Sequence, residues 1–316
     1  MTRVFVYEYL SGGGLVDGDA AATAGLLPQG LAMRNALVAD LLASGDCDVT
    51  AATCAHAGTL PAGAAETVAR NSETPLEFVA RQAAQHDFSW VIAPETDGCL
   101  AGLHRAVGAS RWLGCDAHSI AVASSKSATL RHLAAHDVAT PWTHEAEAKR
   151  WVVKPDDGAG SVATHLHGSR AAAQADLDAR RARGESACLE PWVEGNPMSL
   201  SLLCGLGRAE LLSVNRQHIA ALPDGTLRYD GVTIDVLPAR DPRHRALAAL
   251  AAQLAAALPG LHGFVGIDLV WNDRLGAVPI EINPRLTCAY VGLSQRLGRC
   301  LATEVLAVRR QERLDA

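Results

Sequence analysis

The 316-residue sequence has no apolar run that approaches the roughly 20 residues of a membrane-spanning helix. Its first residues enter a strand-like run, Val4 to Tyr7, without the basic segment and apolar core of a signal peptide. Positive charge is also scarce: 28 Lys and Arg stand against 34 Asp and Glu, whereas a nucleic-acid backbone demands clustered basic residues. We therefore expect a cytoplasmic protein with no membrane and no nucleic-acid partner.

Two common cofactor motifs are missing as well. The 8 cysteines include no CxxC pair, so a zinc or redox motif has no support. The glycines Gly12 to Gly14 fit the dinucleotide-binding pattern G-x-G-x-x-G only in part, because Asp17 occupies the place of the third glycine. A dinucleotide-dependent dehydrogenase is thus only an alternative interpretation.

The composition is that of a globular protein, with 49% hydrophobic and 20% charged residues, and the length suffices for two or three modules. Strand-like segments at 3–10, 48–52 and 88–93 alternate with helical segments at 31–43, 75–86 and 100–107. Such alternation is typical of an open parallel sheet.

The rest of the chain has a mixed pattern. We expect a helix at 124–136, a strand at 151–155, a helix at 169–183, a strand and turn at 188–195, a helix at 243–258, and a hairpin of 264–271 with 277–283. We therefore divide the chain into an N-terminal α/β domain at 1–118, a small subdomain at 119–187 and a C-terminal subdomain at 188–316.

The hairpin carries a candidate metal site. Side chains alternate along a strand, so Glu281 and Asn283 point the same way. A turn that pairs Asn272 with Ala277 places Asp268 opposite Glu281. Hard oxygen ligands of this kind suit Mg²⁺, and two carboxylates in a buried hairpin need a cation or protons. The alternative is that both are merely exposed strand residues.

Single features of the middle segment are weaker evidence. Lys154 ends an apolar strand and precedes a glycine-rich loop, Gly158, Gly160 and Ser161, whose backbone amides suit phosphate oxygens. Lys126 alone is typical of a solvated helix, and Glu190 alone of a strand before a turn.

Taken together and in this order, the motifs resemble the ATP-grasp superfamily. The series is Ser125-Lys126, Val153-Lys154-Pro155 with its glycine loop, Leu189-Glu190-Pro191-Trp192-Val193-Glu194-Gly195, Gly266-Ile267-Asp268, and Ile280-Glu281-Ile282-Asn283-Pro284-Arg285. The resemblance implies an ATP-grasp fold of the α/β class: an N-terminal open parallel sheet followed by two α+β subdomains that clasp ATP.

The resemblance also implies how the nucleotide is bound. Lys126 and Lys154 would hold its phosphates from two sides. Adenine would lie against a hinge of Glu190, Pro191, Trp192 and Val193. Pro191 keeps the carbonyl and Val193 keeps the N–H that adenine needs. Ser199 stands where the family often has a ribose-binding Glu, and is a weaker substitute.

For the chemistry, the resemblance implies a carboxylate–amine ligase that forms ADP and phosphate. Asp268, Glu281 and Asn283 would hold two Mg²⁺ ions, with Mn²⁺ an alternative. Arg285, with Lys154, would be catalytic and stabilise the charge of an acyl phosphate or a tetrahedral intermediate. The loop 156–164 would close as a lid that excludes water from the acyl phosphate.

Further motifs resemble the tyramine–glutamate ligase family of methanofuran biosynthesis. They are Tyr7-Glu8-Tyr9 with the following glycines, Ala93-Pro94-Glu95-Thr96-Asp97, and Val214-Asn215-Arg216-Gln217. This implies that glutamate is activated and that tyramine or a tyrosine-like amine accepts it, in the biosynthesis of a one-carbon coenzyme (methanofuran, methylofuran or tetrahydromethanopterin). The expected substrate contacts are Glu8, Gly12, Gly13, Glu95 and Arg216.

Within this set, Arg216 would grip a carboxylate and Glu8 or Glu95 an ammonium group. The alternatives are a glycine loop that is only a tight turn, a Glu95 that caps a helix, and an Arg216 that is a surface residue. Two further functions stay open: a ligase that joins other amino acids, and a non-catalytic nucleotide-binding regulatory module. The sequence is also compatible with a homodimer.

Overall fold

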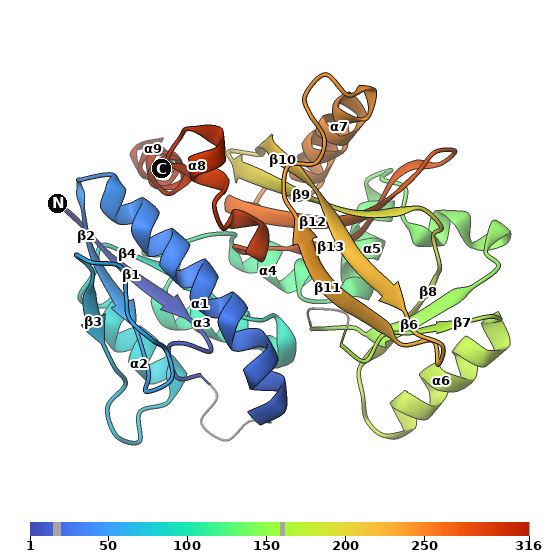
Figure 1. Ribbon diagram of the computed structural model, residues 1–316, viewed down its shortest axis with the longest axis horizontal. Helices are drawn as coiled ribbons and strands as arrows, with labels where there is room; N and C mark the ends of the chain where they lie inside the picture. Colours follow the sequence, from blue (N-terminus) through green and yellow to red (C-terminus); the bar gives the residue numbers. More distant parts are fainter. Residues whose placement is uncertain (15–19, 159–161, 316) are drawn as a thin grey trace.

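The computed structural model describes residues 1–14, 20–158 and 162–315. Its strands form three sheets, one in each of three lobes that Figure 1 shows side by side. Both termini lie on the N-terminal lobe's side of the molecule (Figure 1), where the last helix packs against the first. Among the described helices, none combines the length and apolarity needed to cross a bilayer.

The N-terminal sheet is five-stranded and parallel, with the order β3-β2-β1-β4-β5. Its strands are β1 Thr2–Glu8, β2 Cys47–Ala52, β3 Ala65–Thr67, β4 Phe88–Ile92 and β5 Trp112–Leu113. Alternation along β1 sends Phe5 and Tyr7 toward α2 and α3, and Val4 and Val6 toward α1. The predicted open parallel sheet is therefore confirmed.

The helices of this lobe are α1 Ala20–Ala43, α2 Pro75–Ala83 and α3 Cys99–Val107. α2 begins where predicted, because Thr74 and Glu77 form a capping box and Pro75 occupies the first turn. α1 begins earlier than the predicted residue 31: it runs through Pro28, a residue that usually marks a helix boundary.

The predicted helix at 124–136 is in fact the second of two. α4, Ala117–Ala123, ends before Ser125, whose hydroxyl accepts a hydrogen bond from Ala128 N and caps α5, Lys126–Ala135. Lys126 is therefore the first residue of α5. Its backbone N–H donates a hydrogen bond of 2.8 Å to the Asp156 carbonyl, and its side chain is buried, so the alternative of a solvated helix lysine does not hold.

The small sheet has the order β7-β6-β8. It consists of β6 Trp151–Pro155, β7 His165–His167 and β8 Ala187–Pro191, and α6, Arg170–Ala182, covers one face with Ala173 and Leu177 packed on Trp151 and Val153. Because β8 belongs to this sheet, the boundary placed at 187/188 falls within a strand. The face away from α6 carries Lys154 and Glu190.

The large sheet is antiparallel, with the order β11-β10-β9-β12-β13. Its strands are β9 Asn196–Gly205, β10 Arg208–Ala221, β11 Leu227–Thr233, β12 Gly263–Asn272 and β13 Gly276–Asn283. α7, Pro242–Ala257, packs on one face. Beyond β13 come the 3₁₀ turn Cys288–Tyr290, α8 Leu293–Leu297 and α9 Leu301–Asp315, which fill the space between this sheet and the N-terminal lobe.

The predicted hairpin is present, with one correction at its turn. Asn272 pairs with Gly276 rather than with Ala277. A register shift between Asp268 and Leu269 then adds one residue to β13, so that Asp268 still lies opposite Glu281. The predicted turn pairing was wrong, whereas the pairing of the two carboxylate residues is confirmed.

Candidate active site

Charged side chains from all three lobes meet where the small sheet faces the hairpin. Lys126 Nζ, at the start of α5, lies 3.1 Å from Glu281 Oε1 on β13. The same ammonium group donates a hydrogen bond of 2.7 Å to the carbonyl of Gly158. Lys126 thus links the β12–β13 hairpin to the first part of the glycine-rich loop.

Lys154 provides a second buried cation. Its Nζ lies 2.9 Å from Glu190 Oε2 on the adjacent strand β8, and both side chains are almost completely buried. Burial alone would lower the pKa of Lys154, but the carboxylates of Glu190 and Glu281 raise it above its usual value. Lys154 is therefore a permanent positive charge that faces the hairpin.

Asp268, Glu281 and Asn283 occupy one face of the hairpin, as the alternation predicts. Burial and the Glu281 carboxylate raise the pKa of Asp268 well above its usual range. Two partly buried carboxylates side by side favour a bound cation, and the Asn283 amide oxygen completes a set of hard donors. Among the described residues, no group of three His, Cys, Asp or Glu side chains gathers for a metal, so other oxygen ligands, such as phosphate or water, would complete the coordination.

Arg285 lies two residues beyond this set and pairs with a residue of the N-terminal lobe. Its Nη2 donates to Glu95 Oε2 at 2.9 Å, and its Nε lies 2.9 Å from Glu95 Oε1. Burial alone would lower the pKa of Arg285, but Glu95 raises it. Glu95 makes no side-chain cap on the 3₁₀ turn that follows it, so the capping alternative does not hold.

The predicted hinge residues lie at the end of β8 and beyond it. Pro191 and Val193 are buried, and Trp192 N donates a hydrogen bond of 2.9 Å to the Arg150 carbonyl. Ser199 lies on β9 directly beside Asp268 and accepts a hydrogen bond from Asn215 Nδ2 at 3.3 Å. Ser199 therefore borders the charged cluster, and the hinge residues directly follow its member Glu190 in the chain.

The glycine-rich loop is described only in part. Gly158 has a φ of +114°, a conformation that favours glycine, and its carbonyl accepts the Lys126 hydrogen bond. The preceding Asp157 carboxylate accepts a 2.9 Å hydrogen bond from Asp97 N, which links the loop to the N-terminal lobe. Gly160 and Ser161 lie outside the described residues.

The glycines after β1 form a tight turn. Gly12 N donates to the Glu8 carbonyl at 2.7 Å, and a Cβ on Gly12 would lie 2.5 Å from the Tyr7 ring. Gly13 has a φ of +86°. The buried Glu8 carboxylate accepts hydrogen bonds from Leu10 N and Ser11 N, so the structure gives it a role in holding this turn.

Arg216 is not brought to the cluster. It pairs with Met198 on the sheet face that packs under α7, and its side chain is exposed. Asn215 and Gln217 point to the opposite face, and the Gln217 amide lies close enough to Asp268 to lower its pKa and partly offset the effect of burial. Strand alternation within the Asn215-Arg216-Gln217 motif was the signal that could have identified Gln217.

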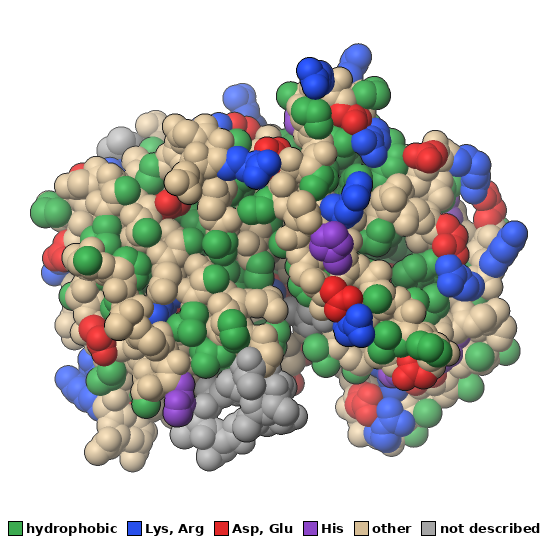
Figure 2. Space-filling view, in the orientation of Figure 1, with side chains coloured by type: hydrophobic (Ala, Val, Ile, Leu, Met, Phe, Trp, Pro, Cys, Tyr) green, Lys and Arg blue, Asp and Glu red, His purple; other side chains and the backbone are tan. Residues whose placement is uncertain are grey.

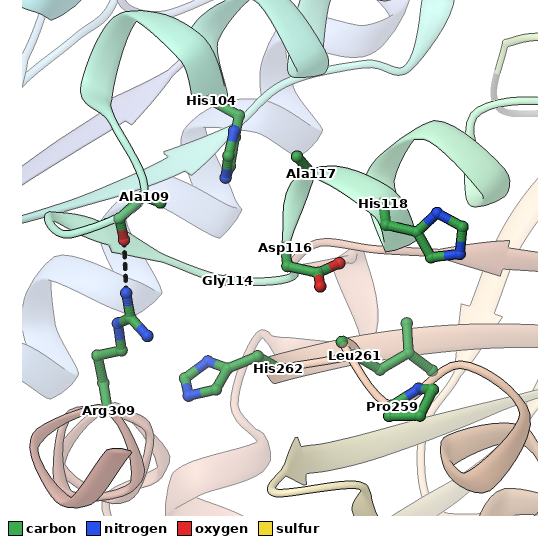
Figure 3. Close-up of a pocket in the computed structure, with 11 residues that line it drawn as sticks. His104, Ala109, Gly114, Asp116, Ala117, His118, Pro259, Leu261, His262 and Arg309 are labelled. Atoms are coloured by element: carbon green, nitrogen blue, oxygen red, sulfur yellow. Dashed lines mark hydrogen bonds between the residues drawn. The ribbon is translucent and has the colours of Figure 1, made fainter. Parts of the chain in front are cut away.

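A hollow elsewhere in the molecule is separate from these residues. It encloses about 420 Å³ between α3, α4 and the start of β12, and none of the predicted site residues lines it. Figure 3 shows His104 and Asp116 directed into it, while Arg309 turns to the carbonyl of Ala109.

Figure 2 shows a notch in the lower edge of the drawn face, between the N-terminal lobe and the lobe of the small sheet.

The sequence matches two domain families. Residues 123–289 match an ATP-grasp domain, and residues 48–120 match a pre ATP-grasp 3 domain. Over 213 residues the chain is 29% identical to a tyramine–L-glutamate ligase of Methanocaldococcus fervens, an alignment that covers 66% of this chain and 61% of that protein. The chain therefore spans about three fifths of the length of this curated relative.

Solved structures resemble the whole fold. An ATP-grasp superfamily protein from Archaeoglobus fulgidus superimposes with a TM-score of 0.71 at 21% identity, covering 97% of this chain and 88% of that one. D-alanine–D-alanine ligase from Bacillus anthracis, in a complex with ATP, gives a TM-score of 0.63 at 14% identity, with 99% and 100% covered. At these identities the likeness concerns the fold alone.

Proposed function

This chain belongs to the ATP-grasp family, and we propose that it is an ATP-dependent carboxylate–amine ligase that joins glutamate to tyramine or a tyrosine-like amine. The ATP-grasp fold implied by the motifs, an N-terminal open parallel sheet followed by two α+β subdomains, is confirmed. The observation that carries the proposal is the buried cluster in which Lys126, Lys154 and Arg285 each pair with a carboxylate.

The cluster suits the phosphates of ATP. Lys126 begins α5 and Lys154 lies near the end of β6, and both side chains lie beside the hairpin, so they can hold phosphate oxygens from two sides. Asp268, Glu281 and Asn283 would hold Mg²⁺, which would neutralise charge on the phosphoryl group and align it for attack. Glu281 now pairs with the ammonium group of Lys126, and this ion pair must open before Glu281 can bind Mg²⁺.

Arg285 would act on the second substrate. Held by Glu95, its guanidinium can bind the carboxylate as that group attacks the γ-phosphate and becomes an acyl phosphate. The amine then displaces phosphate, so the site must exclude water until the amide forms. The loop that contains Gly158 is joined to Lys126 and the N-terminal lobe, a position suited to a lid.

For the nucleoside, we propose that adenine lies against the hinge from Glu190 to Val193, where Pro191 offers only a carbonyl and Val193 retains an N–H. Ser199 is the candidate ribose contact because it lies beside Asp268 on the same sheet face. Neighbours of similar fold include an ATP complex and a complex with ADP and Mg²⁺, which supports these ligands for this chain.

The substrates are proposed from the similarity to tyramine–L-glutamate ligase. Within the biosynthesis of a one-carbon coenzyme such as methanofuran or methylofuran, the product would be a glutamyl amide of tyramine. Glu8, Gly12 and Gly13 hold the turn at the carboxyl end of β1, and Glu95 holds Arg285, so their contribution to substrate binding would be largely indirect.

The test is to trap the activated carboxylate. With ATP, Mg²⁺ and glutamate, hydroxylamine attacks an acyl phosphate and gives a hydroxamate in place of the amide, which is detected as its coloured ferric complex. We expect hydroxamate and ADP in equal amounts, dependent on both glutamate and Mg²⁺. Nucleotide binding without hydroxamate, across a panel of amino acids, would instead identify a nucleotide-binding regulatory module.

A further inference from the structure

A cavity of about 390 Å³ lies between the N-terminal lobe and the large sheet. It is bounded by α1, β11 and the 3₁₀ turn after the hairpin. Its described lining residues are Gln29, Tyr229, Asp230, Gly231, Val232 and Cys288. None of them belongs to the motifs that identify the family, and the cluster described above does not use them.

The cavity adjoins the charged cluster on the sheet face that carries Asp268. On β11, Val232 pairs with Gln217 and Tyr229 with Ile219, so both side chains share the face of Gln217 and Asp268. Cys288 follows Arg285 by three residues, and its thiol lies 3.2 Å from Gln29 Oε1 on α1. One wall of the cavity therefore begins where the carboxylate would be activated.

The lining also has a definite chemistry. Among the described lining residues none is Lys or Arg, and the one carboxylate, Asp230, is already paired with Arg228 at 2.6 Å. The rest offer an aromatic ring, a valine, a thiol and a primary amide. A ring with a hydroxyl group can pack and hydrogen-bond here, whereas a carboxylate would lose water without gaining a cation.

From this arrangement we propose that the cavity is the acceptor subsite, and that it selects an aryl amine that lacks a carboxylate over the corresponding amino acid. The inference rests on the proposed ligase function. It makes Gln29, Tyr229 and Cys288 determinants of acceptor specificity, with the aryl group in the cavity and the amine directed toward Arg285 and the acyl phosphate. The glutamate, which keeps a second carboxylate, must then be held outside this cavity.

The experiment compares three nucleophiles on the intact protein with ATP, Mg²⁺ and glutamate: tyramine, tyrosine and hydroxylamine. Hydroxylamine has no side chain to fill the cavity, so it reports activation of glutamate alone. We expect the wild type to use tyramine at least tenfold better than tyrosine, as kcat/KM. Equal use of the two would overturn the selection against a carboxylate.

Two variants test the position of the subsite. Gln29→Lys places a cation in the cavity and should raise the ratio of tyrosine to tyramine turnover at least tenfold. Leu26→Lys, on the same helix but at an exposed position outside the lining, is the matched control and should leave that ratio as in the wild type. Tyr229→Ala should lower kcat/KM for tyramine at least tenfold more than for hydroxylamine.

The outcomes separate this inference from the proposed function. If the wild type forms no hydroxamate, the ligase function itself fails. If hydroxamate forms in every variant and neither Gln29→Lys nor Tyr229→Ala alters the choice of amine, the cavity is not the acceptor subsite. Hydroxamate formation by a variant also shows that it has folded.

Discussion

Arg285 and Glu95, which lie 190 residues apart in the sequence, form a buried ion pair with two N–O distances of 2.9 Å. The pair joins the segment after the β12–β13 hairpin to the carboxyl end of the N-terminal sheet. In the proposed mechanism Arg285 must meet a substrate carboxylate, so Glu95 both positions the guanidinium and keeps its charge compensated until the substrate arrives.

Removal of one partner should therefore destabilise the protein more than removal of both. Glu95→Gln leaves a buried guanidinium without its carboxylate, a change that typically costs about 3–5 kcal/mol of unfolding free energy. The double variant Glu95→Gln/Arg285→Gln should recover part of this loss. Urea unfolding of the wild type, Glu95→Gln, Arg285→Gln and the double variant gives the coupling energy between the two residues. Additive effects of the two substitutions would contradict a direct pair.

The carboxylate pair of the hairpin should limit the stability of the metal-free protein. The folded state raises the pKa of Asp268 and therefore favours its protonated form. As the pH rises from the usual pKa to the raised one, the folded protein must hold an ionised Asp268, and its stability falls. Asp268→Asn should raise the thermal unfolding midpoint in a chelator, more at about pH 8 than at about pH 5.

Glu281→Gln is the informative comparison for this prediction. It removes the partner of Lys126, 3.1 Å away, and should lower the same midpoint although it also removes a carboxylate. Both variants should lose Mg²⁺-dependent turnover. A lower midpoint for Asp268→Asn at alkaline pH would argue against a strained carboxylate pair.

Lys154 should contribute directly to nucleotide affinity. Lys154→Gln leaves Glu190 buried without its cation and removes a charge-assisted contact to phosphate, so we expect MgATP affinity to fall at least tenfold by calorimetry. Lys149→Gln, at an exposed position outside the cluster, supplies the control and should bind as the wild type does. Equal affinities for the two variants would place the phosphates elsewhere.

Arg216 and Gln217 make opposite predictions because they lie on opposite faces of β10. Gln217→Ala should lower kcat/KM for glutamate at least tenfold, since the side chain lies beside Asp268. Arg216→Ala should change it less than about threefold, because an exposed side chain on the other face makes no charge-assisted contact with substrate. The reverse order of effects would support the original expectation that Arg216 grips a carboxylate.

Much of this site could be predicted because its residues lie in short local patterns. The alternation of Glu281 and Asn283 and the pairing with Asp268 follow from strand geometry, even though the turn and the bulge were not foreseen and happened to compensate each other. The contacts that join lobes could not be found in this way. Nothing local in the sequence pairs Glu95 with Arg285, or brings Gln29 to Cys288, since each contact joins segments that are far apart in the chain.

The start of α1 shows a different limit. Pro28 and the surrounding glycines indicate a break, yet the helix continues through them because Met33, Leu37 and Leu41 pack on the N-terminal sheet and stabilise the whole element. Tertiary packing of this kind outweighs local propensity, and it places Gln29 on a wall of the proposed acceptor subsite.

The most direct test of the account follows one oxygen atom. Glutamate labelled with ¹⁸O in its carboxylates is incubated with the protein, unlabelled ATP, Mg²⁺ and tyramine, and the released phosphate is analysed by mass spectrometry. Activation as an acyl phosphate predicts one ¹⁸O in each phosphate, because the carboxylate oxygen leaves with the phosphoryl group when the amine forms the amide. Phosphate that carries no label, released while the amide accumulates, would contradict the acyl-phosphate mechanism.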